Sequence, residues 1–167
     1  PVILLGEDGM PSDIRVRERG DAECLIEAFM LVANEAVARK MTEKNIPCVY
    51  RVHAAPSEEK AKELTTFLHN IGFDTSYIQK DAVTTKALSR ILEEAKKRGI
   101  SEAVSYVMLR SMAKAEYAAR AEGHFGLALP LYCHFTSPIR RVSDLAVHRI
   151  LHGTLLGGES PKKYVSY

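Results

Sequence analysis

Two adjacent arginines, Arg140 and Arg141, stand near the end of the sequence in the stretch HFTSPIRRVSDLAVHR, residues 134–149. The Thr-Ser-Pro before them predicts a helix start, because a hydroxyl can cap free N–H groups and proline suits the first turn. Positive side chains in that turn oppose the helix dipole, at a cost of roughly 0.3 kcal/mol or more. A bound phosphate would compensate them, since helix N-termini and guanidinium groups both favour anions.

The same spacing also has an ordinary structural interpretation. Asp144 stands three residues after Arg141 and four residues before His148, so these side chains neighbour one another on a helix. An exposed ion pair of this kind contributes about 0.3–0.5 kcal/mol. The residues alone therefore leave two interpretations open, a solvated polar face and a phosphate site.

Further candidate residues lie in three other stretches. Glu27 and Asn34 lie two turns apart on one side of an expected apolar helix, which predicts partial burial, either as a structural polar pair or as a site for sugar hydroxyls. Tyr132 and His134 precede the arginines, where aromatic rings suit the stacking of unpaired bases, although core packing explains the phenylalanines of the same run. The extended stretch YRVH at 50–53 is more typical of structure than of function.

Other chemistries find no support in the sequence. It contains no G-x-S-x-G stretch and no phosphate-binding glycine loop, and the three cysteines, Cys24, Cys48 and Cys133, form no C-x-x-C pattern. Two-metal phosphoryl transfer needs several carboxylates around one site, whereas the acids here lie mostly on expected helix surfaces beside lysines. The sequence therefore predicts no nucleophile and no metal site within this chain.

Composition limits the class of protein. The chain has 167 residues, 46% of them apolar, which suits one domain or a piece of a larger one. Its 23 Lys and Arg against 21 Asp and Glu leave a net charge of +2, so any anion site must be local. No apolar run approaches the roughly 18 residues of a membrane span and no signal peptide is present, which predicts a cytoplasmic protein without membrane contact.

The elements that position these residues follow from hydrophobic periodicity and turn signals. We expect a strand, a turn at 6–11 and a second strand, then a long core helix from Asp21 to about Lys44 and a strand at 47–53. The remaining expectations are helices at about 58–69, 84–98, 101–120 and 139–156, a connector at 73–83, an extended segment at 123–133 and a turn or linker at 157–163. Together they predict a mainly helical α+β fold, with four or five helices packed on a few strands.

The string GHFGLALPLYCHFTSPIRRVSDLAVHR, residues 123–149, resembles the signature near the end of the catalytic domain of the ribonuclease II and ribonuclease R family, the RNB family. Four other stretches resemble the family in the same order: ERGDAECLIEAFMLVANEAVA, IPCVYRVHAAPSEEK, KALSRILEEAKKRG and VMLRSMAKAEY. The resemblance covers nearly the whole chain and is strongest to bacterial ribonuclease R. It implies that residues 1–167 are the C-terminal portion of an RNB catalytic domain.

Members of this family degrade single-stranded RNA processively from the 3′ end by metal-assisted hydrolysis, releasing nucleoside 5′-monophosphates. The resemblance implies such an exoribonuclease as the parent protein, with Mg²⁺ as its cofactor and single-stranded RNA as its partner. The family's metal-binding aspartates stand upstream of the matched region, and no such cluster precedes Glu18. We therefore expect this chain alone to bind no metal and to be inactive. The alternative is a non-catalytic RNA-binding or protein-docking module derived from the family.

The resemblance also implies roles for single residues. Arg140 matches the arginine of the SPIR motif, which contacts the RNA phosphate near the scissile bond and supports transition-state charge. Arg141 matches a second basic position of that catalytic motif. Glu27 matches a ligand of the terminal ribose, and Tyr132 and His134 match positions near the base-stacking part of the site.

Two positions depart from the family pattern. Ala28 stands where a second acid is common, and Val142 stands where an aromatic residue usually follows the two basic ones. The second departure affects a packing or stacking contact and not the arginines. An apolar face that packs against the rest of the domain would be exposed in this chain, and self-association is one way to cover it.

Overall fold

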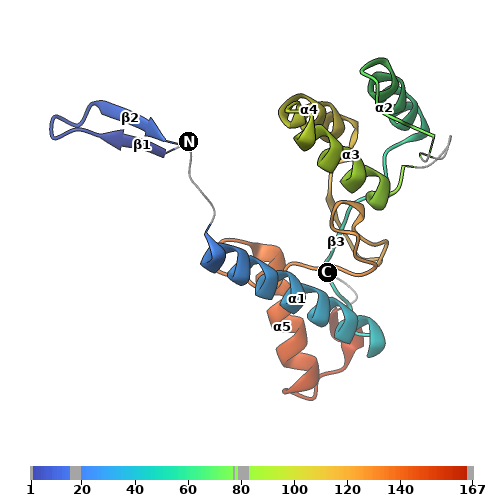
Figure 1. Ribbon diagram of the computed structural model, residues 1–167. Coiled ribbons are helices and arrows are strands. Elements are labelled where there is room, and N and C mark those ends of the chain that lie inside the picture. The colour runs from blue at the N-terminus through green and yellow to red at the C-terminus, as the bar shows by residue number, and fades with distance from the viewer. Residues whose placement is uncertain (1, 16–19, 77, 79–82, 165–167) are drawn as a thin grey trace. The chain divides into compact units, whose positions relative to one another are not determined.

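The computed structural model describes residues 2–15, 20–76, 78 and 83–164, and it divides into two compact units, residues 1–33 and 34–167 (Figure 1). These described residues form five α-helices and two antiparallel two-stranded sheets. The arrangement confirms the mainly helical α+β class predicted from the sequence. No helix within the described ranges is long and apolar enough to cross a bilayer.

The first unit begins with a β-hairpin. Strands β1 (Val2–Leu5) and β2 (Pro11–Arg15) pair antiparallel, which confirms the predicted strand, turn and strand. The Gly6 N–H donates to the Met10 carbonyl at 2.8 Å and closes the turn. Gly9 has a φ of 74°, a conformation that glycine adopts without steric cost.

Helix α1 (Asp21–Glu43) begins in the first unit and ends in the second. Its first half was expected to be a core helix, and this is wrong: Leu25, Ile26, Phe29 and Val32 are all more than half exposed. The physical reason is that, among the described residues of this unit, the hairpin is the other element, and no second helix there covers the apolar stripe. The second half behaves as predicted, since Ala38 and Met41 are fully buried.

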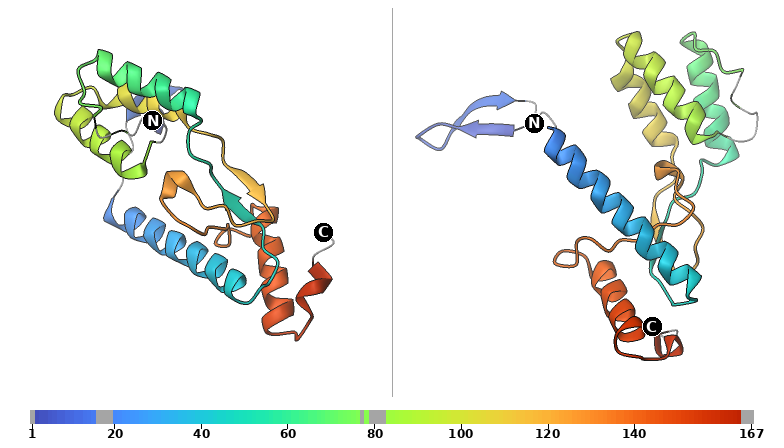
Figure 2. Two further views of the ribbon diagram at one scale, coloured as in Figure 1. Left: turned by 90° about the vertical axis from the view of Figure 1, so that its right-hand side faces the viewer. Right: turned by 60° about the horizontal axis from the view of Figure 1, so that its bottom comes forward.

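Three helices of the second unit share one apolar core. Helices α2 (Glu58–Asn70), α3 (Thr85–Lys97) and α4 (Ser101–Ser111) lie together (Figure 2). Their shared core contains side chains such as Leu64, Ile91 and Val104. Ser57 and Thr84 cap α2 and α3 by accepting backbone N–H groups. These caps explain why the predicted helix starts agree with the structure.

The predicted helix at 101–120 is too long, because α4 ends at Ser111. Met112 already has an extended backbone, and the chain then enters strand β4 (Glu116–Ala118). In β4, Tyr117 pairs with Arg51 of strand β3 (Tyr50–Val52). Pairing with a strand far away in the sequence overrides the local helical pattern.

The second unit has another apolar core, called the second core here, which includes Tyr50 and Val52 of strand β3 together with Cys133 and Val147. Tyr50 and Val52 point into it and are buried, whereas Arg51 and His53 alternate to the other face and are only partly covered, as predicted. Tyr50 also pairs with Cys133, so the chain after the 3₁₀ helix η1 (Phe125–Leu127) borders the other edge of β3. Apart from η1, this confirms an extended segment there.

Helix α5 (Val142–Leu155) completes the second core through the buried Val147. It begins three residues later than predicted, because Pro138–Arg140 form a turn and Arg141 is the residue that flanks the helix start. After α5 the chain bends, and the 3₁₀ helix η2 (Pro161–Tyr164) lies against α5. The Glu159 N–H donates to the Gly153 carbonyl at 2.9 Å, which fastens this bend to α5.

Candidate nucleic-acid interface

The predicted site residues 132–141 follow the edge of β3. The Arg51 N–H donates to the Tyr132 carbonyl at 2.9 Å. This hydrogen bond fixes the position of the segment along strand β3. Cys133 is fully buried beneath it. By the alternation of extended chain, His134 lies on the side of the chain opposite to Cys133, the side shared with Tyr132, and it is partly buried.

Asn34 of α1 fixes this segment with its whole amide group. Its Nδ2 donates to the Tyr132 hydroxyl at 3.0 Å, and its Oδ1 accepts the N–H groups of Phe135 at 2.9 Å and Thr136 at 3.2 Å. The backbone carbonyl of Asn34 accepts the Cys133 thiol at 3.4 Å. The side chain is 3% exposed, which confirms its predicted burial and shows that it is a structural clamp.

Two histidines hold neighbouring parts of the chain. The His148 ring stacks on Phe135 at 3.9 Å between centroids, and its Nε2 donates to the Phe135 carbonyl at 2.8 Å. The Gly126 N–H donates to His53 Nδ1 at 2.8 Å, so the ring proton is on Nε2, which donates to the Ala113 carbonyl at 2.8 Å. Both side chains are thus engaged with backbone, and for His53 this agrees with the structural interpretation of YRVH.

The start of α5 is organised by a fully buried carboxylate. Asp144 Oδ2 accepts the Ser137 N–H at 2.8 Å, and Oδ1 accepts the Ser143 hydroxyl at 3.2 Å. Arg141 Nε lies 3.0 Å from Oδ1 as an ion pair, although its N–H is not aligned as a hydrogen bond. The charge of Arg141 at the positive end of the helix is therefore balanced by an acid in the first turn.

Arg140 differs from its neighbour. It lies in the turn before α5 with an exposed side chain, and no carboxylate pairs with it among the residues that the structure describes. Its backbone N–H donates to the Ser137 carbonyl at 3.3 Å, which holds the turn. The sequence gives no reason to distinguish the two arginines. In the structure, Arg140 is the one of the two whose guanidinium stays available for an external anion.

An aromatic cluster adjoins Arg141. Tyr132 is buried, and its ring meets His134 edge-on at 5.8 Å. Tyr117 also contacts His134, and its hydroxyl shares a hydrogen bond of 2.9 Å with His134 Nδ1. Burial first, and then the positive charge of Arg141, lower the pKa of His134 from 6.5 to about 4. His134 is therefore a neutral ring at physiological pH.

The structure brings three of the five predicted site residues into this cluster, Tyr132, His134 and Arg141, and places Arg140 in the turn directly before Arg141. Glu27 lies in the first unit and is exposed, so its predicted partial burial is wrong for the same reason as the exposed stripe of α1.

Sequence reasoning missed Tyr117, because the helical pattern of SMAKAEYAAR concealed a short strand. It also placed Asp144 only on a solvated face. The spacing of three residues between Arg141 and Asp144 indicates an ion pair on a helix. It does not show that Asp144 is fully buried, which is what makes this ion pair important to the structure.

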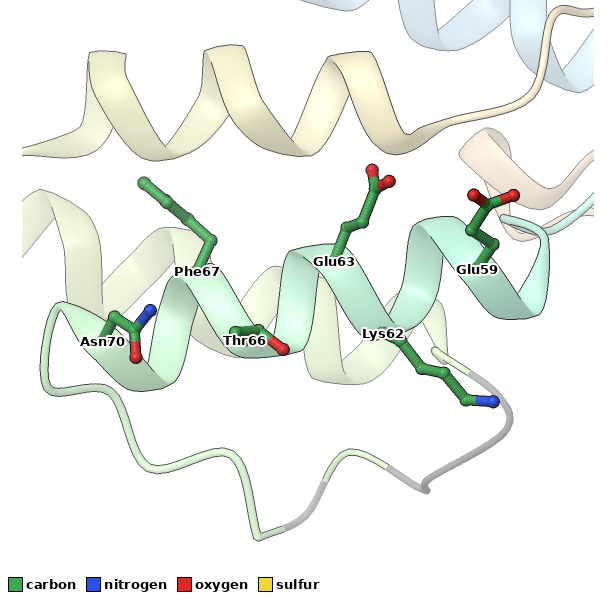
Figure 3. A pocket seen from close by; sticks show the side chains of 6 residues that line it. All are labelled: Glu59, Lys62, Glu63, Thr66, Phe67 and Asn70. Atoms are coloured by element: carbon green, nitrogen blue, oxygen red, sulfur yellow. The ribbon is translucent and has the colours of Figure 1, made fainter.

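A separate hollow of about 580 Å³ lies along α2, lined by Glu59, Lys62, Glu63, Thr66, Phe67 and Asn70 (Figure 3). All six side chains come from one face of a single helix, so the hollow is a shallow surface feature. The chemical groups of the predicted site do not line it. It contributes nothing to the interface described above.

The described residues do not fit the Mg²⁺ ion that the resemblance implies. Within the described ranges, no group of three or more His, Cys, Asp or Glu side chains is arranged to hold a metal. Both oxygens of Asp144, the buried carboxylate nearest the arginines, already have protein partners. No step of the chemistry is therefore assigned to a metal held by these residues.

Comparison with known proteins agrees with the resemblance. The chain is 41% identical over 157 residues to "Ribonuclease R" of Aquifex aeolicus, with 94% of this chain and 22% of that protein covered. It is 42% identical over 149 residues to "Ribonuclease R" of Thermotoga maritima, with 89% of this chain and 21% of that protein covered. The chain thus spans about a fifth of the length of these relatives.

A solved structure shares the fold. The structure of Mycoplasma genitalium RNase R in complex with ribose-methylated single-stranded RNA matches with a TM-score of 0.84 and 34% identity. The match covers 98% of this chain and 25% of that one. The RNB domain family matches residues 2–157, which is nearly the whole sequence. The chain therefore belongs to the RNB domain family.

Proposed function

We propose that this chain supplies RNA phosphate and ribose contacts within a 3′–5′ exoribonuclease that hydrolyses single-stranded RNA processively to nucleoside 5′-monophosphates. Membership of the RNB family and relatives named ribonuclease R support this proposal. The observation that carries it is Arg140, an exposed cation in a fixed turn with no carboxylate partner among the described residues. A guanidinium held in this way binds a phosphate without first breaking an ion pair.

The two arginines have different roles in this proposal. Arg140 contacts the phosphate near the scissile bond and stabilises the charge that develops there, which a preorganised cation does without reorganisation. Arg141 adds positive potential from a position fixed by Asp144. His134 offers a neutral ring toward a base, with the buried Tyr132 supporting it from the core side. Glu27 is proposed as the ribose ligand because it matches the family motif.

Magnesium belongs to the proposed reaction of the whole protein, with the ion held by residues other than those described here. When bound, it would supply activation of water and stabilisation of phosphate charge. Self-association of the chain and a cytoplasmic location stay predictions from the sequence.

Binding of a fluorescein-labelled single-stranded oligoadenylate, followed by anisotropy, tests the phosphate contact. We expect Arg140→Ala to weaken binding about tenfold, and to reduce the slope of log affinity against log salt by about 0.7, the value for one lost phosphate contact on a single strand. Arg39→Ala is the matched control, since it removes the same charge from a guanidinium that Glu35 already holds at 2.6 Å. Equal affinities for the two variants would refute the assignment of Arg140.

Hydrolysis of a 5′-labelled RNA in the presence of Mg²⁺ tests the catalytic part. We expect this chain to bind RNA without shortening it, whereas the whole parent protein releases nucleoside 5′-monophosphates from the 3′ end. A whole protein that binds RNA and leaves it intact would instead favour the alternative of a non-catalytic RNA-binding or docking module.

A further inference from the structure

Arg51 and Tyr117 form a cross-strand pair outside the arginine motif. Strands β3 and β4 lie side by side (Figure 2, left). Arg51 and Tyr117 stand directly opposite each other in their register, so their side chains share one face of the sheet. The Arg51 guanidinium lies over the Tyr117 ring, with Cζ 4.7 Å from the ring centroid. This contact holds the guanidinium against the ring face while its N–H groups stay available as donors.

The tyrosine ring is held in place and still accessible. Its hydroxyl is bonded to His134 at 2.9 Å, and the two rings meet edge-on at 5.7 Å. Although Arg51 covers one face, the residue remains 47% exposed. The accessible surface therefore belongs to the remaining face and edges, on a ring whose orientation is already determined.

The charge around this pair is positive and uncompensated. No carboxylate pairs with Arg51 among the residues that the structure describes, whereas Arg141 is balanced by Asp144. Arg51 also contributes, after burial and Arg141, to the lowered pKa of His134, which agrees with a positive charge near that ring. An exposed aromatic face beside a free guanidinium is the combination that binds unpaired bases together with their phosphates.

We propose that Arg51 and Tyr117 form a nucleotide-binding subsite for single-stranded RNA, in which the Tyr117 ring stacks on an unpaired base and Arg51 donates to the adjoining phosphate. The inference rests on the proposed function, because it assigns a further contact to the same RNA. It differs from the Arg140 contact in chemistry, because the Tyr117 ring contacts the face of a base, whereas Arg140 contacts a charged phosphate of the RNA backbone. No base edge is recognised, so the subsite tolerates any sequence and prefers the larger purines.

The chain contains a matched control for this pair. On α4, Arg110 donates to the Tyr106 hydroxyl at 3.1 Å, and its Cζ lies 5.8 Å from the Tyr106 ring centroid. Tyr106 is 60% exposed, so the same two side-chain types are displayed on the surface of a helix. Among the described residues, this pair lacks the hydrogen bond to a histidine that Tyr117 has, and no second arginine corresponds to Arg141, which lies near the proposed subsite.

The experiment measures binding of labelled oligoadenylate and oligouridylate to the chain by anisotropy, with circular dichroism as the check on folding. We expect Tyr117→Leu to weaken oligoadenylate binding about 5- to 150-fold, the range for losing one stacked base. The effect on oligouridylate is smaller, and Tyr117→Trp restores oligoadenylate affinity. Tyr106→Leu changes neither affinity.

The outcomes separate this inference from the function on which it rests. If Tyr117→Leu binds like the unchanged protein while Arg140→Ala is weakened, the subsite is refuted and the proposed function stands. If neither variant is weakened, the proposed function fails as well. Should Tyr117→Leu unfold, Arg51→Met keeps the packing volume but removes the charge, and an unchanged salt slope for that variant overturns the proposal.

Discussion

Replacing Asn34 with alanine is the most direct perturbation of the segment that carries the site. The amide donates to Tyr132 and accepts the N–H groups of Phe135 and Thr136, residues about a hundred positions away. Alanine keeps the backbone of α1 and removes all three bonds at once. The change therefore measures what the clamp contributes to the folded state.

The expected cost follows from these bonds. A buried N–H without an acceptor costs about 1–3 kcal/mol, and we take about 1 kcal/mol each for Phe135 and Thr136 because both bonds are only partly buried. Loss of the bond to Tyr132 adds about 1 kcal/mol. The higher helix propensity of alanine offsets about 0.5 kcal/mol. We expect the free energy of unfolding to fall by about 2–3 kcal/mol.

Urea unfolding measures this loss, with circular dichroism following the helices and the intrinsic fluorescence of the seven tyrosines following the packing. Asn70→Ala is the control, because this exposed asparagine ends α2 and its replacement is expected to change stability by less than about 0.5 kcal/mol. A loss for Asn34→Ala no larger than that of the control would refute the clamp. Amide exchange at residues 132–136, faster only in the Asn34 variant, would locate the effect.

Three further predictions concern buried or partly buried groups. Asp144→Asn leaves Arg141 without its counter-charge, and we expect urea unfolding to show a loss of about 2–3 kcal/mol, with a loss below 1 contradicting the ion pair. The pKa of His134 is about 4 in the folded state and 6.5 in the unfolded state, so the unfolded state binds the proton more tightly. The free energy of unfolding therefore falls as pH drops from about 6.5 to 4. That loss is about 1–2 kcal/mol after allowance for partial exposure, and thermal unfolding of His134→Gln should lack it. The exposed Cys24 should react rapidly with a thiol reagent in the native state, whereas Cys48, whose pKa a neighbouring thiol and burial raise far above its usual value, should react only on unfolding.

Local signals in the sequence predicted the elements whose ends are locally determined. Ser57 and Thr84 each cap a helix with their own side chains, and Gly72 and Gly99 follow those helices with φ values of 78° and 70°. Such caps act within one turn of the chain, so a reader of the sequence can recognise them. The elements bounded by these residues agree with the structure to within a residue or two.

The errors occur where a distant partner decides the structure. Tyr117 leaves the helical pattern because it pairs with Arg51, and α5 starts late because Asp144 accepts the N–H of Ser137 and holds a turn. Asn34 showed only that a polar residue lies on an apolar helix, and its partners lie in another part of the sequence. Periodicity contains no information about such pairings, so the candidate site was predicted as a set of residues and not as an arrangement.

The arrangement changes what the two arginines mean. From the sequence, Arg140 and Arg141 are both expected in the first turn of one helix, where they oppose its dipole and where a bound phosphate would compensate both charges. In the structure the helix starts after both, and Asp144 satisfies Arg141 from inside the first turn, at 3.0 Å and with no exposure of its own. The local penalty is thus removed without any ligand. What remains is Arg140, which the fold holds outside the helix and leaves without a counter-charge among the described residues. Of the two adjacent arginines, Arg140 therefore carries the proposed contact with an RNA phosphate, and Arg141 adds positive potential from its fixed position beside Asp144.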